Sequence, residues 1–251
     1  MHTLSPQPPV PPSGNGKSEP SAAPGPVPEA RKGGPGKVIV AVAILIIFAA
    51  GGLAGFYVGS LKTKEPSKAP ELPVDTAVHP TAWARIDTSY GVIVVGLYGN
   101  ETPKTTGNFI NLTNLGFYTR TTFHRVVAGF VMQGGGYDEN MTLMAVPFPP
   151  IKLEISPKLN NTRGTLAMAR TNDPDSATTQ FFINLVDNRA MLDPGGTGRE
   201  GYAVFGIVLK GMDVVDTIAT APVIDPGYGE RSRPDPPVMI YSITMVPAPV
   251  G

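Results

Sequence analysis

The hydrophobic positions of this chain follow two patterns, the first of which is one long apolar run. Residues 38–60, "VIVAVAILIIFAAGGLAGFYVGS", contain no charged side chain. About 20 apolar residues in a helix span a hydrocarbon core of about 30 Å, so the run predicts a transmembrane helix. A buried core helix would be shorter and amphipathic. A cleaved signal peptide is the stronger alternative, because "GLAG" offers small residues for cleavage, although 37 residues precede the run.

The second pattern begins near residue 78, where the apolar runs become short and are separated by turn residues. Runs of this kind are "AWARIDTSYGVIVVGLY", "RTTFHRVVAGFVMQGG", "GTLAMAR", "QFFINLV", "YAVFGIVL" and "PVMIYSITMV". Two stretches show helical spacing instead, residues 102–118 and residues 211–221. Many short strands with two helices predict a mainly β fold, an antiparallel barrel with two capping helices.

Prolines and charges divide the rest of the chain. Ten of its 28 prolines lie in residues 1–36, so we expect a disordered, Pro-rich segment over 1–37. Residues 61–77, "LKTKEPSKAPELPVDTA", resemble a linker. Residues 78–251 are expected to form the globular domain, with 13 basic and 15 acidic residues and a formal charge of 13 − 15 = −2.

Basic residues on the two sides of the apolar run are nearly balanced. Arg31, Lys32 and Lys37 precede it, and three lysines follow it at positions 62, 64 and 68. Lys37 directly adjoins the run, which favours a cytoplasmic N-terminus. We therefore expect a single-pass membrane protein whose large domain is extracytoplasmic.

The overall composition excludes several classes of function. Lysine plus arginine and aspartate plus glutamate total 20 each, so the chain lacks the basic excess of a nucleic-acid-binding protein. It contains no cysteine, which excludes disulfides, thiolate metal sites and cysteine nucleophiles. Its three histidines are scattered at positions 2, 79 and 124. We expect neither a metal nor a cofactor.

Four segments in order carry the strongest functional signal. They are "FHRVVAGFVMQGG" (123–135), "RGTLAMARTNDPDSATTQFFINLVDN" (163–188), "MLD" (191–193) and "GYAVFGIVLKGMDVVDTI" (201–218). Together they resemble the bacterial-type cyclophilins, a family of peptidyl-prolyl cis/trans isomerases. The resemblance runs from about residue 80 to residue 246.

The resemblance implies a closed eight-stranded barrel and an external groove that binds X-Pro segments of polypeptides. It implies that Arg125 in "FHR" is catalytic, together with Phe130 and Gln133 of the "GF-x-x-Q" pattern. The remaining groove residues that it implies are Val131, Ala169, Gln180, Phe182, Met191, Leu192 and Tyr202. No cofactor is needed for this chemistry.

These residue types suit the reaction. An X-Pro amide has a rotation barrier of about 18–20 kcal/mol because of its partial double bond, and an arginine keeps its charge and offers several donors to the twisted state. An arginine in an arbitrary strand is more often a surface residue in a salt bridge, and Phe130 and Phe182 alone would more often be core residues. We expect His124 to be a structural histidine rather than a proton donor.

One loop departs from the family pattern. Many eukaryotic members carry tryptophan just before "LD", where this chain has Met191. Methionine supplies no N–H donor, so binding of the family's inhibitor cyclosporin should be weakened. The main functional hypothesis is a membrane-tethered isomerase that assists protein folding. The alternatives are a non-catalytic proline-binding or holdase module and a scaffold whose Pro-rich N-terminus recruits partners.

Overall fold

The computed structural model describes residues 78–197, 200–227 and 229–249. The predicted disordered segment, transmembrane helix and linker all fall in residues 1–77, outside the described residues. Within the described ranges, no helix combines the length and the apolar composition that a membrane crossing requires.

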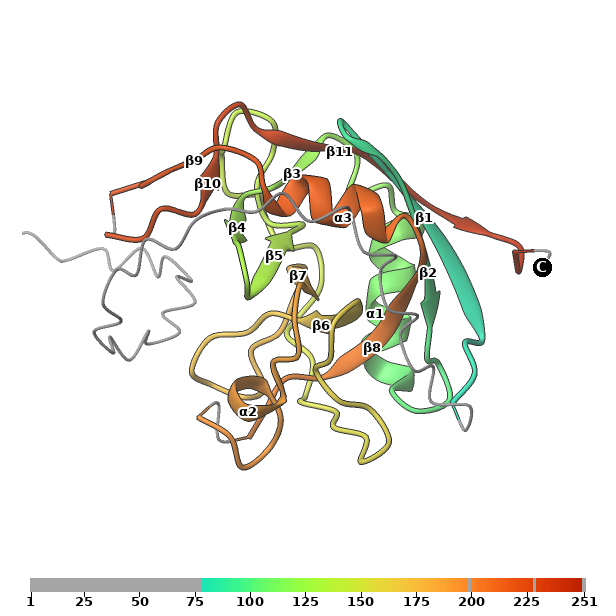
Figure 1. The fold of residues 1–251 in the computed structure, drawn as a ribbon. Coiled ribbons are helices and arrows are strands. Elements are labelled where there is room, and N and C mark those ends of the chain that lie inside the picture. Colours follow the sequence, from blue (N-terminus) through green and yellow to red (C-terminus); the bar gives the residue numbers. More distant parts are fainter. Residues whose placement is uncertain (1–77, 198–199, 228, 250–251) are drawn as a thin grey trace, which may run out of the picture. The chain divides into compact units, whose positions relative to one another are not determined.

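The described residues form a nine-stranded antiparallel sheet and a separate two-stranded ribbon (Figure 1). The strand order in the large sheet is β3-β11-β1-β2-β8-β6-β7-β5-β4, and β9 pairs with β10 in the ribbon. The bounds are β1 Ala82–Thr88, β2 Gly91–Leu97, β3 Thr121–Phe123, β4 Arg125–Val127, β5 Val131–Gly134, β6 Thr165–Met168, β7 Phe181–Asn184, β8 Val204–Lys210, β9 Val223–Ile224, β10 Arg233–Pro234 and β11 Val238–Val246.

The two ends of the large sheet meet, so that it forms a nearly closed barrel. Strands β3 and β4 stand at opposite ends of the strand order, yet only His124 separates them in sequence. The N–H of Gly135, just after β5, also donates to the carbonyl of Thr122 in β3 at 3.4 Å. The predicted mainly β barrel is confirmed in this form. The predicted count of eight strands differs from the nine in the large sheet, where the residues on the two sides of His124 form separate strands because β3 pairs with β11 and β4 pairs with β5.

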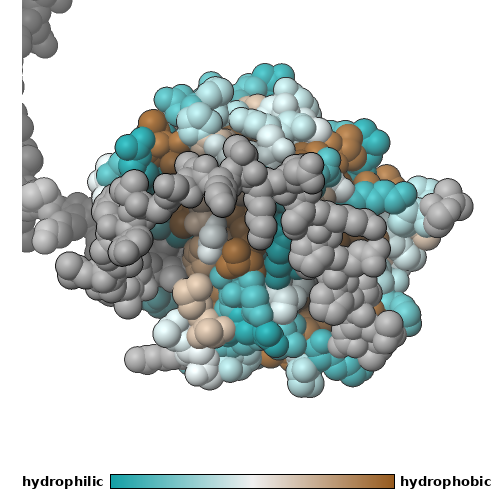
Figure 2. Space-filling view, in the orientation of Figure 1, coloured by the Kyte–Doolittle hydropathy of each residue, from teal (hydrophilic) through white to brown (hydrophobic). Residues whose placement is uncertain are grey.

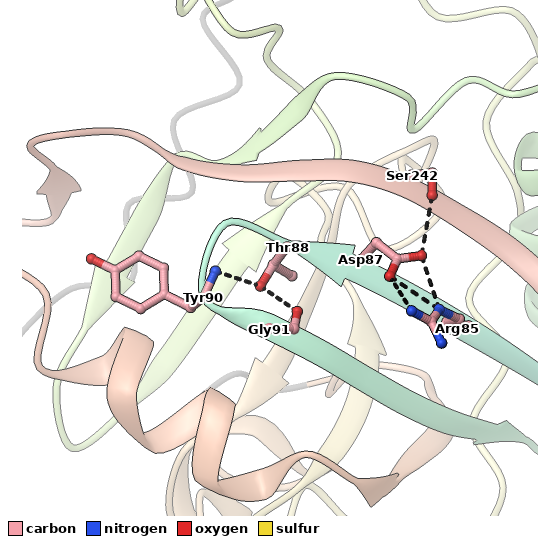
Figure 3. Close-up of polar contacts among 6 residues, drawn as sticks. All are labelled: Arg85, Asp87, Thr88, Tyr90, Gly91 and Ser242. Carbon is pink, nitrogen blue, oxygen red and sulfur yellow. Dashed lines mark hydrogen bonds and ion pairs between the residues drawn. The ribbon is translucent and has the colours of Figure 1, made fainter.

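Strand alternation separates an inner from an outer face. In β1, Ala84 and Ile86 are fully buried, whereas Arg85 and Asp87 form an ion pair on the outside (Figure 3). The main core is filled from the inner face of the strands, as expected when successive side chains point to opposite sides. In the view of Figure 2, most of the described surface is hydrophilic, with smaller hydrophobic areas between.

The two predicted helices are present within their expected ranges. Helix α1, Pro103–Asn114, begins with a proline, whose fixed φ suits the first turn, and it buries Phe109 and Leu112. Helix α3, Met212–Ala219, buries Val215 and Ile218. It follows Gly211, which has φ 89°, and a Cβ at Gly211 would lie 2.4 Å from the carbonyl oxygen of Val92. A third helix, α2 (Arg189–Leu192), is a single turn that the sequence pattern did not predict.

Candidate active site

The outer face of β4 and β5 places a charged side chain beside apolar ones. Val126 and Met132 belong to the main core, so their neighbours Arg125, Val131 and Gln133 point to the other face of the sheet. Arg125 and Gln133 are direct partners in the ladder between β4 and β5. The arginine therefore sits in a strand without entering the core, which explains the mixed pattern of "FHRVVAGF".

A second group of buried apolar residues, separate from the main core, lies on this outer face. We call it the outer cluster; it consists of Phe130, Val131, Ala167, Ala169, Phe182, Leu192, Tyr202 and Val204. It contains all of the apolar residues predicted for the groove except Met191. Two of its rings, those of Phe182 and Tyr202, meet edge to face with their centroids 5.7 Å apart.

Three polar side chains lie against the outer cluster. The Nε2 of Gln133 donates to Oε1 of Gln180 at 2.8 Å, and the guanidinium carbon of Arg125 lies 5.9 Å from the centre of the Phe130 ring. Two polar atoms of this group are buried without a hydrogen-bond partner among the described residues, Nη1 of Arg125 and Oε1 of Gln133. A buried donor and a buried acceptor without partners cost about 1–3 kcal/mol each, so a polar ligand that reached these two atoms would be stabilised by hydrogen bonds to them.

The glycines of "GGG" make room for the side chains around them, including that of Gln180. A Cβ on Gly136 would lie 2.5 Å from Cδ and Nε2 of Gln180, and a Cβ on Gly134 would lie 2.8 Å from the ring of Phe123. The backbone after β5 therefore passes close to its neighbours, and Gly136 allows the Gln180 amide to rest over it and reach Gln133.

His124 is buried beside the arginine and is poorly suited to proton transfer. Burial lowers its pKa to about 3, and the positive charge of Arg125 adds to this effect. Its ring lies 4.5 Å from the ring of Tyr137. The imidazole is thus neutral near pH 7 and fills a structural position, as the sequence led us to expect.

Met191 does not join the outer cluster. It lies in α2 and is 36% exposed, while its neighbour Leu192 is 1% exposed. A single helical turn directs one of these two side chains inward and the other to solvent. The other predicted groove residues are together in one place, and Met191 lies at its margin.

Sequence reasoning missed a set of buried amides that tie the walls of the site together. Nδ2 of Asn188 donates to the carbonyl of Phe130 at 2.9 Å and to Oδ1 of Asn184 at 2.8 Å. Nδ2 of Asn161 reaches the carbonyls of Leu192 and Tyr202, each at 3.2 Å. Their only sequence signal is the recurrence of asparagine near the groove motifs, which does not reveal partners.

Two charged residues were also missed. The guanidinium carbon of Arg170 lies 4.5 Å from the centre of the Tyr202 ring, and its Nη2 donates to the carbonyl of Gly201 at 2.9 Å. Glu230 forms an ion pair with Arg125 at 2.8 Å. It comes from the segment between β9 and β10, in which the sequence predicted no site residue. No group of three or more His, Cys, Asp or Glu side chains in the described part of the chain is placed to hold a metal ion.

Comparison with protein families gives one match that spans most of the described residues. Residues 83–245 match the family described as "Cyclophilin type peptidyl-prolyl cis-trans isomerase/CLD". A peptidyl-prolyl cis-trans isomerase of Acinetobacter baylyi is 50% identical over 156 residues, which cover 62% of this chain and 81% of that protein. Peptidyl-prolyl cis-trans isomerase B of Escherichia coli is 45% identical over 160 residues, which cover 63% of this chain and 96% of that protein.

Solved structures agree with this match. The crystal structure of a cyclophilin-type isomerase from Cryptosporidium parvum has a TM-score of 0.55 and 26% identity, and the alignment covers 67% of this chain and 99% of that one. A second crystal structure of the parasite protein, described as in the presence of the dipeptide Ala-Pro, has a TM-score of 0.54.

Proposed function

This chain belongs to the cyclophilin family of peptidyl-prolyl cis-trans isomerases, and from that premise we propose that Arg125, Gln133, Gln180 and the outer cluster form its active site. The chain is an enzyme that catalyses rotation about X-Pro peptide bonds. The observation that carries the assignment is the unpartnered, buried Nη1 of Arg125 beside the apolar cluster. The parasite relative's description with Ala-Pro supports an X-Pro ligand for this surface.

Each group has a role that follows from its chemistry. In the twisted transition state the amide loses conjugation, and the proline nitrogen becomes pyramidal and gains a lone pair. Nη1 of Arg125 donates to the prolyl carbonyl oxygen and toward that nitrogen, which lowers the barrier because these contacts are stronger in the twisted state than in either planar state. The open Oε1 of Gln133 accepts an N–H of the peptide backbone.

The apolar part of the site holds the proline ring. Phe130 and Tyr202 are the most exposed members of the outer cluster, at 9% each. The proline ring packs against these two side chains, and beneath them lie the more deeply buried Phe182, Leu192 and Val131. The two glutamines bind the peptide backbone and the outer cluster binds the proline ring. Neither contact recognises the side chains of the residues next to the proline. Substrate proteins are therefore selected by an accessible X-Pro segment.

The test is Arg125→Ala in the full-length protein, with exchange of an Ala-Pro peptide followed by NMR. We expect kcat/KM to fall by about 10- to 1000-fold, equivalent to about 1.4–4 kcal/mol of transition-state stabilisation. Arg85→Ala is the matched control, because Arg85 lies on the outer face of β1 and pairs only with Asp87 among the hydrogen bonds described for it. Wild-type exchange by Arg125→Ala would contradict the assignment. A wild-type protein that binds the peptide without accelerating exchange would favour the holdase alternative.

We further propose that the enzyme is anchored by residues 38–60 and acts on folding proteins outside the cytoplasm. The support is the uninterrupted apolar run and the position of Lys37 directly before it. Membrane fractionation with protease accessibility in intact cells tests both points. A soluble product that begins near Gly55 would indicate a cleaved signal peptide.

A final proposal concerns the inhibitor cyclosporin. The exposed Met191 lies at the margin of the site and offers neither an N–H donor nor a flat ring. Cyclosporin should therefore bind this enzyme weakly, whereas short proline peptides do not require that position.

A further inference from the structure

The guanidinium of Arg125 is held on one edge by a carboxylate that lies 105 residues away in the sequence. Nε donates to Oε1 of Glu230 at 2.8 Å, and Nη2 donates to Oε2 at 2.9 Å. Two parallel bonds of this kind fix both the position and the plane of an arginine.

The carboxylate itself is fixed by the segment that carries it. The carbonyl of Ser232 accepts the N–H of Val126 at 2.7 Å, and so ties this segment to β4, the last strand of the sheet. Before Glu230, the carboxylate of Asp225 accepts the backbone N–H groups of Gly227 and Gly229, at 2.7 and 3.1 Å. Glu230 thus lies between the turn closed by Asp225 and the hydrogen bond from Val126 to Ser232, two residues before Ser232.

The pair has a solvent side and a protein side. The side chain of Glu230 is 42% exposed and that of Arg125 is 12% exposed. The Nη1 of the arginine, which Glu230 does not contact, is buried and without a partner among the described residues. The carboxylate therefore binds the solvent-facing edge of the guanidinium, and Nη1 remains available to bind the substrate.

We propose that Glu230 is a positioning residue for catalysis: its bidentate pair with Arg125 selects the arginine rotamer that directs Nη1 to the substrate. This inference rests on the proposed function of Arg125. A free arginine has several rotamers, and the rate scales with the fraction of molecules in the competent one. Glu230 raises that fraction before the substrate arrives, so its effect should appear in kcat rather than in KM.

The first experiment compares Glu230→Ala and Glu230→Gln with the wild type in the full-length protein. Glu230→Ala should lower kcat/KM about tenfold with KM nearly unchanged, equivalent to about 1.4 kcal/mol. Glu230→Gln keeps one acceptor oxygen, so its kcat/KM should fall less than that of Glu230→Ala. Asp87→Ala is the matched control, since it removes another bidentate carboxylate from an arginine, Arg85, on the outer face of β1 (Figure 3). It should leave kcat/KM at the wild-type value.

The second experiment places Glu230→Ala in the Arg125→Ala background. If Glu230 acts through the arginine, the double variant should have the same kcat/KM as Arg125→Ala alone. This cycle also separates the two hypotheses. A fully active Arg125→Ala would overturn the proposed function, whereas a large loss in Arg125→Ala with an additive loss from Glu230→Ala would overturn only the positioning role.

The pH profile provides a readout that a purely structural role would not change. Arg125 holds the pKa of Glu230 below its ordinary value, although burial opposes this. Wild-type kcat/KM should therefore stay constant down through the ordinary glutamate range and fall only as the pH drops through that lowered pKa. Glu230→Gln should lack this fall.

The other ionisable groups around the pair are shared by the wild type and the Gln variant. His124 and Tyr202 both lie close enough for the charge of Arg125 to affect their pKa. Within the segment, Arg231 donates to the carbonyl of Val223. These groups contribute equally to the two profiles. Circular dichroism at each pH shows that the protein is folded, and the conservative Gln variant covers the case in which Glu230→Ala fails to fold.

Three results would overturn the proposal. One is an unchanged or higher kcat in Glu230→Ala, the latter being expected if the carboxylate blocked the arginine. The second is a loss expressed wholly in KM. The third is a fall in kcat/KM at low pH that has the same midpoint and the same size in the wild type and in Glu230→Gln.

Discussion

Asn161→Ala should destabilise the enzyme and loosen one wall of its site. Asn161 is 1% exposed, and its Nδ2 is within hydrogen-bond distance of the carbonyls of Leu192 and Tyr202 and of Oδ1 of Asp193. Its own Oδ1 accepts from Nδ2 of Asn184 at 3.2 Å. Alanine removes all of these contacts while keeping the backbone N–H of residue 161, which binds Asp193 at 2.8 Å.

The magnitude follows from which partners keep another bond. The Leu192 carbonyl still accepts the N–H of Tyr202 at 2.9 Å, and Nδ2 of Asn184 still reaches Oγ1 of Thr165 at 3.0 Å. The Tyr202 carbonyl loses its side-chain donor. The variant loses about two net hydrogen bonds and leaves one buried acceptor without a donor. The free energy of unfolding should therefore fall by about 2–4 kcal/mol. For a domain of this size, the melting temperature should fall by about 4–16 °C.

Equilibrium unfolding in urea and the peptide exchange assay measure the two consequences. We expect the midpoint to fall and KM to rise several-fold, because Leu192 and Tyr202 lose a common anchor. Asn161→Asp should be at least as destabilising, since it sets a carboxylate against the Asp193 carboxylate and two carbonyls. The exposed Asn140 is the control, and Asn140→Ala should change stability by less than about 0.5 kcal/mol. A change in Asn161→Ala as small as that of the control would refute the reasoning.

Three further predictions concern pH, packing and inhibition. Burial, and then the charge of Arg125, lower the pKa of His124 to about 3, so the unfolded chain takes up a proton below about pH 6.5 that the folded chain does not. The free energy of unfolding should therefore fall by up to about 1.4 kcal/mol per pH unit between pH 6 and pH 4. In His124→Asn this fall should be less steep. Gly136→Ala should push the Gln180 amide away and raise KM, since its Cβ would lie 2.5 Å from that amide, whereas Gly107→Ala, with nothing within 4 Å, should keep wild-type kinetics. Met191→Trp should restore part of the cyclosporin sensitivity, by about 5- to 150-fold for one hydrogen bond and an aromatic surface; tight inhibition of the wild type would contradict this.

The sequence by itself determined the fold class, and its resemblance to the cyclophilins supplied most of the candidate site residues. Period-two alternation in "FHRVVAGFVMQGG" and "QFFINLV" is a local property, and it fixes which side chains leave the core face of a strand. The expectation that Arg125, Gln133 and Phe182 share one groove came instead from the resemblance of their motifs to the cyclophilins, because Phe182 alone would more often be a core residue. The helices could be predicted from a local pattern, because Phe109 with Leu112 and Val215 with Ile218 repeat at helical spacing within one segment.

Tertiary structure decided the features that depend on partners far apart in sequence. The run around His124 is divided into β3 and β4 because the residues before it pair with β11 and the residues after it pair with β5, at opposite ends of the strand order. The turn of α2 directs Leu192 inward and leaves Met191 at the margin. The pairing of Glu230 with Arg125 spans 105 residues and arises only because the segment after β9 lies along the edge of β4. A local pattern indicates the direction of a side chain, but an ion pair between residues 105 positions apart depends on how distant segments of the chain pack together.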